Sequence, residues 1–78
     1  MKTDNSGAVR VVQVRAEPIE LSKFLKLAGA TESGGEAKQI VNEGEVAVNG
    51  EIETRKGRKL RAGDTVSYGS ETFVVELA

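Results

Sequence analysis

A tight β-hairpin is encoded by Val46-Ala47-Val48-Asn49-Gly50-Glu51-Ile52. Val46 and Val48 alternate along the chain as one face of a strand does, and Asn49-Gly50 tolerates the positive φ angles of a type I′ turn. The returning strand is predicted over residues 51–54, with Ile52 pointing inward. The turn should therefore set the register, with Val48 and Ile52 reaching the same core.

Two short helices are predicted before this hairpin. The first has an apolar face with the spacing i, i+3, i+4 and i+7, made by Leu21, Phe24, Leu25 and Ala28, and Gly29 provides its end. Lys23 and Lys26 fall on its opposite side.

The second helix is predicted to begin with a capping box at Ser33-Gly34-Gly35-Glu36. In this motif the Ser33 hydroxyl accepts from the Glu36 amide, and the Glu36 carboxylate accepts from the Ser33 amide. An apolar stripe follows, and the helix should end near Gly44 after about ten residues, close to the usual helix length.

Three further strands complete the predicted fold. Alternating or β-branched patterns occur over residues 9–15, 65–68 and 71–77, with turn signals at residues 62–64 and 69–70. The order β-α-α-β-β-β-β predicts an α+β domain with two short helices packed on one side of a small antiparallel sheet. We expect residues 1–8 to form a flexible leader and residues 9–78 to form a single domain that folds as a monomer.

The composition excludes several classes of function. The chain has 78 residues with no Cys and no His, which removes the commonest nucleophiles, general bases and transition-metal ligands. We therefore expect no catalytic site, no cofactor and no metal. The sequence shows neither a signal peptide nor a membrane span, and the lack of Cys fits a reducing compartment, so a cytoplasmic location is expected.

Positive charge is concentrated in one segment although the formal net charge is only -1. Five of the eleven Lys and Arg residues lie between residues 55 and 61, and no acidic residue occurs from residue 54 to residue 63. The basic run consists of Arg55, Lys56, Arg58, Lys59 and Arg61. Such a run can create a local positive field for a polyanion, or it can simply solvate an exposed loop.

The chain resembles a known RNA-binding family. The segments at residues 21–25, 33–38, 44–50 and 60–64 occur in the order and spacing of the RNA-binding domain named for small-subunit ribosomal protein four, the S-four domain. The resemblance covers residues 20 to about 68. It implies an L-shaped surface of two helices and the following hairpin region that binds structured RNA, such as ribosomal or transfer RNA, and possible contact with ribosomal particles.

The resemblance also implies which residues share the RNA surface. Many family members have Arg where this chain has Glu20 and Gly34, which shifts the expected contacts toward the basic run. The N-terminus of the second helix, at Ser33, could hold one more phosphate. The predicted RNA-binding residues are Lys23, Lys26, Ser33, Lys38, Arg55, Lys56, Arg58, Lys59 and Arg61.

Recognition by shape and phosphate geometry is expected in preference to base stacking. The three aromatic residues, Phe24, Tyr68 and Phe73, all read as core or strand positions, so a stacking platform is missing. The alternative function, from another class, is a protein-interaction adaptor whose basic loop binds an acidic partner. Salt-sensitive binding to purified RNA would separate the two.

Overall fold

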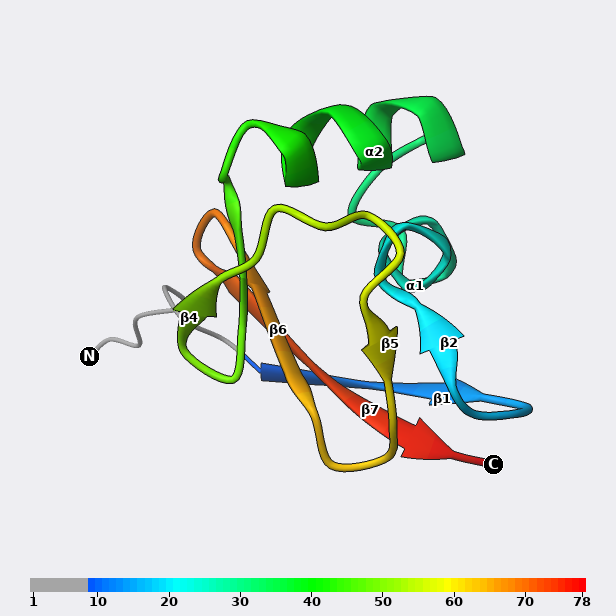
Figure 1. The fold of residues 1–78 in the computed structure, drawn as a ribbon. Helices are drawn as coiled ribbons and strands as arrows, with labels where there is room; N and C mark the ends of the chain where they lie inside the picture. The colour runs from blue at the N-terminus through cyan, green and yellow to red at the C-terminus, as the bar shows by residue number, and fades with distance from the viewer. Residues whose placement is uncertain (1–8) are drawn as a thin grey trace.

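A computed structural model of the protein describes residues 9–78, so the leader predicted for residues 1–8 lies outside the described residues. Its main sheet has five strands in the order β1-β7-β6-β3-β4 (Figure 1). Their bounds are Val9–Val14 for β1, Glu71–Leu77 for β7, Thr65–Tyr68 for β6, Val46–Val48 for β3 and Glu51–Ile52 for β4. The neighbouring strands β7, β6, β3 and β4 run antiparallel, as predicted.

Strand β1 is an exception, because it pairs with β7 in parallel. The two strands come from opposite ends of the domain and are not joined by a hairpin, so no tight turn imposes an antiparallel arrangement. Val9 lies opposite Thr72, and Val14 lies opposite Leu77. The N-terminal and C-terminal parts of the domain are thus joined along one edge of the sheet.

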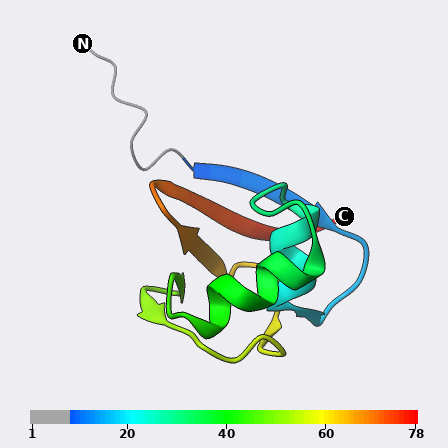
Figure 2. The same cartoon turned by 90° about the horizontal axis from the view of Figure 1, so that it is seen from above.

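Both helices lie on the same side of the sheet, as Figure 2 shows. Helix α1 spans Leu21–Leu27 and helix α2 spans Gly34–Asn42. Their predicted apolar faces are buried, apart from Ala28, which follows α1 and is only partly buried. Together with the inner face of the sheet they form one core. Phe24 of α1 and Phe73 of β7 meet edge to face, with ring centroids 6.4 Å apart. The prediction that these two rings belong to the core is confirmed, and Tyr68 packs against the core while partly buried.

A second, two-stranded sheet was not predicted. Strands β2 (Ile19–Glu20) and β5 (Lys59–Leu60) pair antiparallel, so part of the basic run is a strand and not a loop. Leu60 is fully buried in this sheet. The short ladder therefore holds the basic run against the beginning of α1.

The hairpin is present, but the predicted orientation of Ile52 is wrong. Asn49 and Gly50 have φ angles of 52° and 86°, as a type I′ turn requires. In this register Ile52 lies opposite Ala47, and its side chain is 65% exposed. Residues opposite one another in a ladder point to the same face. The next residue, Glu53, whose amide donates to the Val46 carbonyl at 2.9 Å, is therefore the one on the core side.

The capping box at α2 is also only partly as predicted. The Ser33 hydroxyl accepts from the Glu36 amide at 3.1 Å. The Glu36 carboxylate, however, accepts from the amide of Glu32 at 2.9 Å and not from that of Ser33. The side chain reaches one residue further back, so the reciprocal half of the motif is formed with the residue that precedes the cap.

Candidate nucleic-acid interface

The basic run begins with a tight turn that is fixed to α1. The amide of Arg58 donates to the carbonyl of Arg55 at 3.1 Å, which closes the turn. The first two amides of α1, those of Leu21 and Ser22, donate to the carbonyls of Arg58 and Lys56 at 2.8 and 3.2 Å. Amides at a helix start have no partner within the helix, so the turn satisfies donors that would otherwise need water. We call residues 55–58 the basic turn.

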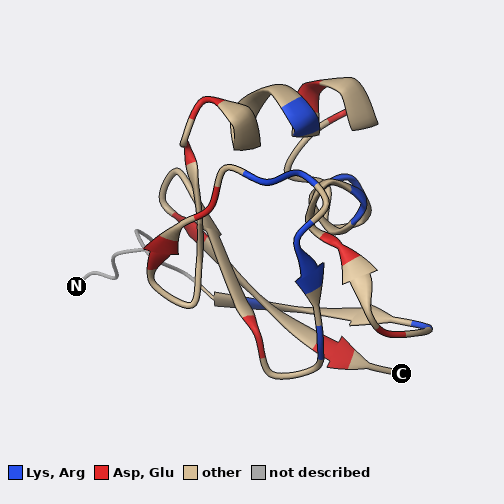
Figure 3. Cartoon of the chain, viewed as in Figure 1, with Lys and Arg blue, Asp and Glu red and all other residues tan. Residues whose placement is uncertain are grey.

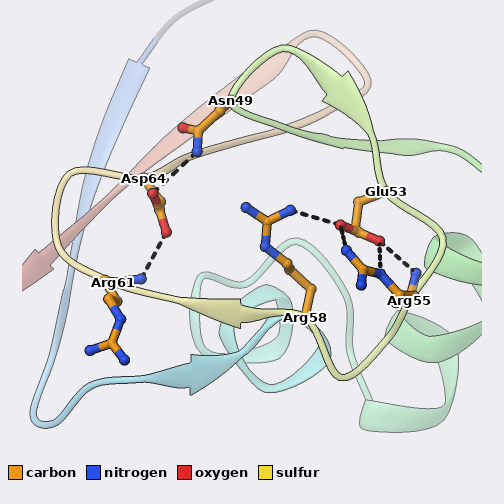
Figure 4. A network of polar contacts seen from close by, with 6 residues as sticks. All are labelled: Asn49, Glu53, Arg55, Arg58, Arg61 and Asp64. Carbon is orange, nitrogen blue, oxygen red and sulfur yellow. Dashed lines mark hydrogen bonds and ion pairs between the residues drawn. The ribbon is translucent and has the colours of Figure 1, made fainter.

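Glu53 binds both ends of the basic turn (Figure 4). Its carboxylate accepts from the amide and Nε of Arg55 at 3.0 and 2.9 Å and from Nη1 of Arg58 at 2.8 Å. These hydrogen bonds from Arg55 and then Arg58 lower the pKa of Glu53 to about 2. The same pairing raises the pKa of Arg55. Two positive charges of the basic run are thus held by one buried negative charge.

Glu53 is therefore not an ordinary solvated strand residue. The residue is only 7% exposed, and it organises the turn. A signal for this was present in the sequence, since a two-residue turn at Asn49-Gly50 places position 53 opposite Val46, on the core face. A carboxylate at a core position that is followed by two arginines indicates a buried ion pair.

The two cations of the basic run that lie outside the basic turn, Lys59 and Arg61, are in β5 and just beyond it. Lys59 is opposite Glu20 in the small ladder, and its Nζ is 3.5 Å from the Glu20 carboxylate. Arg61 donates its backbone amide to Asp64 at 2.8 Å, while its side chain extends away from the Glu53 cluster in Figure 4. Lys59 is therefore partly compensated by Glu20.

Two grooves bring predicted residues together, one beside the basic turn and one beside β2, β5 and α1. A groove of about 590 Å³ between α2 and the turn is lined by Lys38, Arg55 and Lys56, together with Gly35, Gln39, Asn42, Thr54 and Gly57. A second groove, of about 510 Å³, contains Lys23 and Lys59 and adds Arg15, which the sequence reading missed. Nothing in the sequence marked Arg15 as a binding residue, because a position at the end of a predicted strand is not a functional signal. Figure 3 shows the cations of the turn, of β5 and of α1 close to one another.

Four of the predicted residues line neither groove, namely Lys26, Ser33, Arg58 and Arg61. The first two also lie outside the basic run. Lys26 is exposed in the last turn of α1 and lines neither groove. Ser33 uses its hydroxyl oxygen to cap α2, and the carboxylate of Glu36 already lies beside that helix start. Their roles in RNA binding stay predictions.

Within residues 9–78 the structure contains no group of three or more acidic side chains that could hold a metal ion. No helix in this part of the chain is long and apolar enough to cross a membrane.

Comparisons with known proteins fit this geometry. The S4 domain model matches residues 12–76. YbcJ of Escherichia coli (strain K12) is 47% identical over 57 residues, which are 73% of this chain and 81% of YbcJ. RlbA of Bacillus subtilis (strain 168), named a probable ribosome maturation protein, is 49% identical over 55 residues, or 70% of this chain and 78% of RlbA.

The fold has a solved counterpart as well. The solution structure of YbcJ from E. coli, described as revealing an αL motif involved in RNA binding, matches with a TM-score of 0.64 and 37% sequence identity. The match covers 97% of this chain and 94% of YbcJ. Since the family model spans most of the chain and close relatives cover more than two thirds of it, the chain belongs to the S4 domain family.

Proposed function

We propose that the protein is a non-enzymatic, monomeric RNA-binding protein of the cytoplasm that recognises structured RNA through the surface around the basic turn. The observation that carries this proposal is the basic turn, which is fixed to α1 and whose exposed Arg55 and Lys56 line the groove beside α2. A second groove, beside β2 and β5, adds further cations. Lys and Arg at such positions neutralise phosphates, which supply most of the binding energy for nucleic acids. The names given to YbcJ and RlbA support the same function.

Structured RNA is the favoured class because the surface offers charge without stacking platforms. Phe24 and Phe73 are fully buried, and Tyr68 packs against the core. Single-stranded RNA is commonly bound by stacking its bases on exposed aromatic rings, whereas folded RNA is bound through its shape and backbone. Ribosomal RNA is the first candidate, because RlbA is named for ribosome maturation, and transfer RNA is the second.

The proposal is tested by titrating the purified protein with folded ribosomal RNA fragments, transfer RNA and an unstructured RNA of equal length at several salt concentrations. If about four or five phosphates are neutralised, log K should fall with log salt at a slope of roughly -3 to -4.5. Folded RNA should bind more tightly than the unstructured RNA. Failure to bind any RNA, together with binding to an acidic polypeptide, would favour the adaptor function.

The non-enzymatic part needs a separate measurement. Incubating the folded RNA that binds best with excess protein should leave its length and its nucleoside composition unchanged. The relevant readouts are gel electrophoresis and mass spectrometry of the digested RNA. A cleaved or modified product whose formation co-purifies with the protein through several columns would contradict this part of the proposal.

A further inference from the structure

Glu53 binds two arginines that differ greatly in exposure. The Arg55 side chain is 75% exposed, whereas that of Arg58 is 33% exposed. Both are held by the same buried carboxylate, at 2.9 and 2.8 Å. Charge patterning along the chain does not distinguish these two arginines, but the structure does.

Arg55 is held by one edge of its guanidinium group. Its Nε donates to Oε2 of Glu53 at 2.9 Å, and its Nη2 donates to Oε1 at 3.2 Å. A guanidinium has five N–H donors in a rigid plane, so the edge formed by the two terminal nitrogens still carries free donors. Among the described residues, the only hydrogen-bond acceptor of the Arg55 side chain is Glu53. The carboxylate therefore fixes the plane of the group and leaves a second edge available.

The surroundings of Arg55 suit an anion. Arg55 lines the groove between α2 and the basic turn, together with Lys38 and Lys56. None of the eight residues that line this groove within the described chain is acidic. A planar fork of two N–H donors matches two oxygens of a phosphate, and two ammonium groups in the same groove add to the attraction.

Arg58 is placed as an anchor. Its amide closes the basic turn, its carbonyl accepts from the first amide of α1 at 2.8 Å, and its Nη1 donates to Glu53. It lines neither groove. Its contacts are therefore directed into the protein.

We propose that Glu53 is a positioning residue for RNA binding. It holds Arg55 by one edge so that the other edge binds a backbone phosphate of the RNA in the groove beside α2, while Arg58 fixes the turn. This inference rests on the proposed function and adds a division of labour within the basic run.

The test compares substitutions that keep the positive charge. Arg55→Lys keeps the charge but loses the fork, so the affinity for the best folded RNA should fall about tenfold, as for one charge-assisted hydrogen-bonded contact, with the salt slope unchanged. Arg58→Lys also keeps the charge but weakens the anchor of the turn, so it should lower the melting temperature and reduce the affinity clearly less than Arg55→Lys does. Arg10→Lys is the matched control, because Arg10 is also exposed and ion-paired, at 3.2 Å from Glu71 on the main sheet.

A double-mutant cycle then tests the role of Glu53. In a Glu53→Gln background the guanidinium of Arg55 is no longer oriented. Arg55→Lys should then reduce the RNA affinity by no more than about twofold. The difference from the loss of about tenfold in the unaltered protein is the coupling between the two positions. Equal losses from Arg55→Lys and Arg58→Lys, or an unchanged cost of Arg55→Lys in the Glu53→Gln background, would overturn the inference. If Glu53→Gln does not fold, the RNA affinities of Arg55→Lys and Arg58→Lys decide whether the inference holds. Absence of RNA binding by the unaltered protein would instead overturn the proposed function.

Discussion

Glu53 determines how the charge of the basic run is presented. Its carboxylate lies beneath the basic turn and hydrogen-bonds to Arg55 and Arg58. An unpaired buried carboxylate would be strongly destabilising, so the pairing is needed for folding as well as for the shape of the turn. The cations that this leaves without an ion pair among the described residues include Lys38 and Lys56 in the groove beside α2.

The lowered pKa of Glu53 predicts how stability depends on pH. Because the folded-state pKa is about 2 and the ordinary value is 4.5, the ion pair contributes fully above pH 4.5 and its contribution is lost as the pH falls toward 2. Urea denaturation between pH 2 and 7 measures this contribution. At neutral pH the free energy of unfolding of the unaltered protein should be much larger than that of Glu53→Gln, and we call this difference the gap. The gap should narrow below pH 4.5.

The control for this experiment is Glu51→Gln, which removes an exposed carboxylate from the same hairpin. We expect it to follow the unaltered protein across the whole range. A gap for Glu53→Gln that is the same at every pH would show that the carboxylate is not held as an ion.

Gly50 gives a second prediction at the residue scale. Its φ of 86° lies in the left-handed region, while a Cβ at Gly50 would meet no atom within 4 Å. Gly50→Ala should therefore cost about 1–2 kcal/mol from backbone strain alone. Gly57→Ala is the matched control, because Gly57 also has open space and its φ lies outside the positive region. Chemical denaturation measures the stability of both variants. Equal stabilities of Gly50→Ala and Gly57→Ala would contradict the turn assignment.

At the scale of secondary structure, periodicity identified each helix and each strand of the main sheet. The helices follow from apolar spacing and from Ser33 and Gly44 at the ends of α2, signals that are local in sequence. The ladder of β2 and β5 could not be found in this way. Each of its strands has two residues, and their pairing depends on contacts between positions about 40 apart in the chain.

The candidate site was predictable in kind but not in detail. Charge spacing identified the basic run, and the fold brings Lys38 to Arg55 and Lys56, and Lys23 to Lys59. Which cations are compensated depends on Glu53 and Glu20, and these pairings follow from register and from tertiary contacts. Register also explains the mistaken orientation of Ile52, since the two-residue turn places it opposite Ala47.

The hairpin register gives a prediction at this scale. Ile40 of α2 is 7% exposed and Ile52 of β4 is 65% exposed. Ile40→Ala should destabilise the protein by about 2–5 kcal/mol, the usual cost of emptying a core site. Ile52→Ala should change the free energy of unfolding by no more than about 0.5 kcal/mol, as at other surface sites. Thermal or urea denaturation of the two variants measures both changes in stability. Similar losses of stability for Ile40→Ala and Ile52→Ala would contradict this register.

At the scale of the whole molecule, the fold gathers cations around the basic turn and β5 although the formal net charge is only -1. The basic turn, β5 and α1 bring cations close together, and acidic residues occur on β4, on the turn before β6 and on β7, and also on β2 (Figure 3). A local field of this kind can attract a polyanion to one face of a nearly neutral protein. The location of a charge should therefore matter more than the total charge.

The most direct test of this account is the salt dependence of RNA binding after removal of single charges. Lys38→Gln and Lys56→Gln each remove one cation from the groove beside α2. Arg10→Gln removes one cation from β1, and Arg10 lines neither groove. Each lysine variant should bind folded RNA more weakly, and the magnitude of the slope of log K against log salt should fall by about 0.7–0.9. Arg10→Gln should keep the affinity and slope of the unaltered protein. Equal effects from all three substitutions would show that net charge alone drives binding, and would contradict an RNA surface centred on the basic turn.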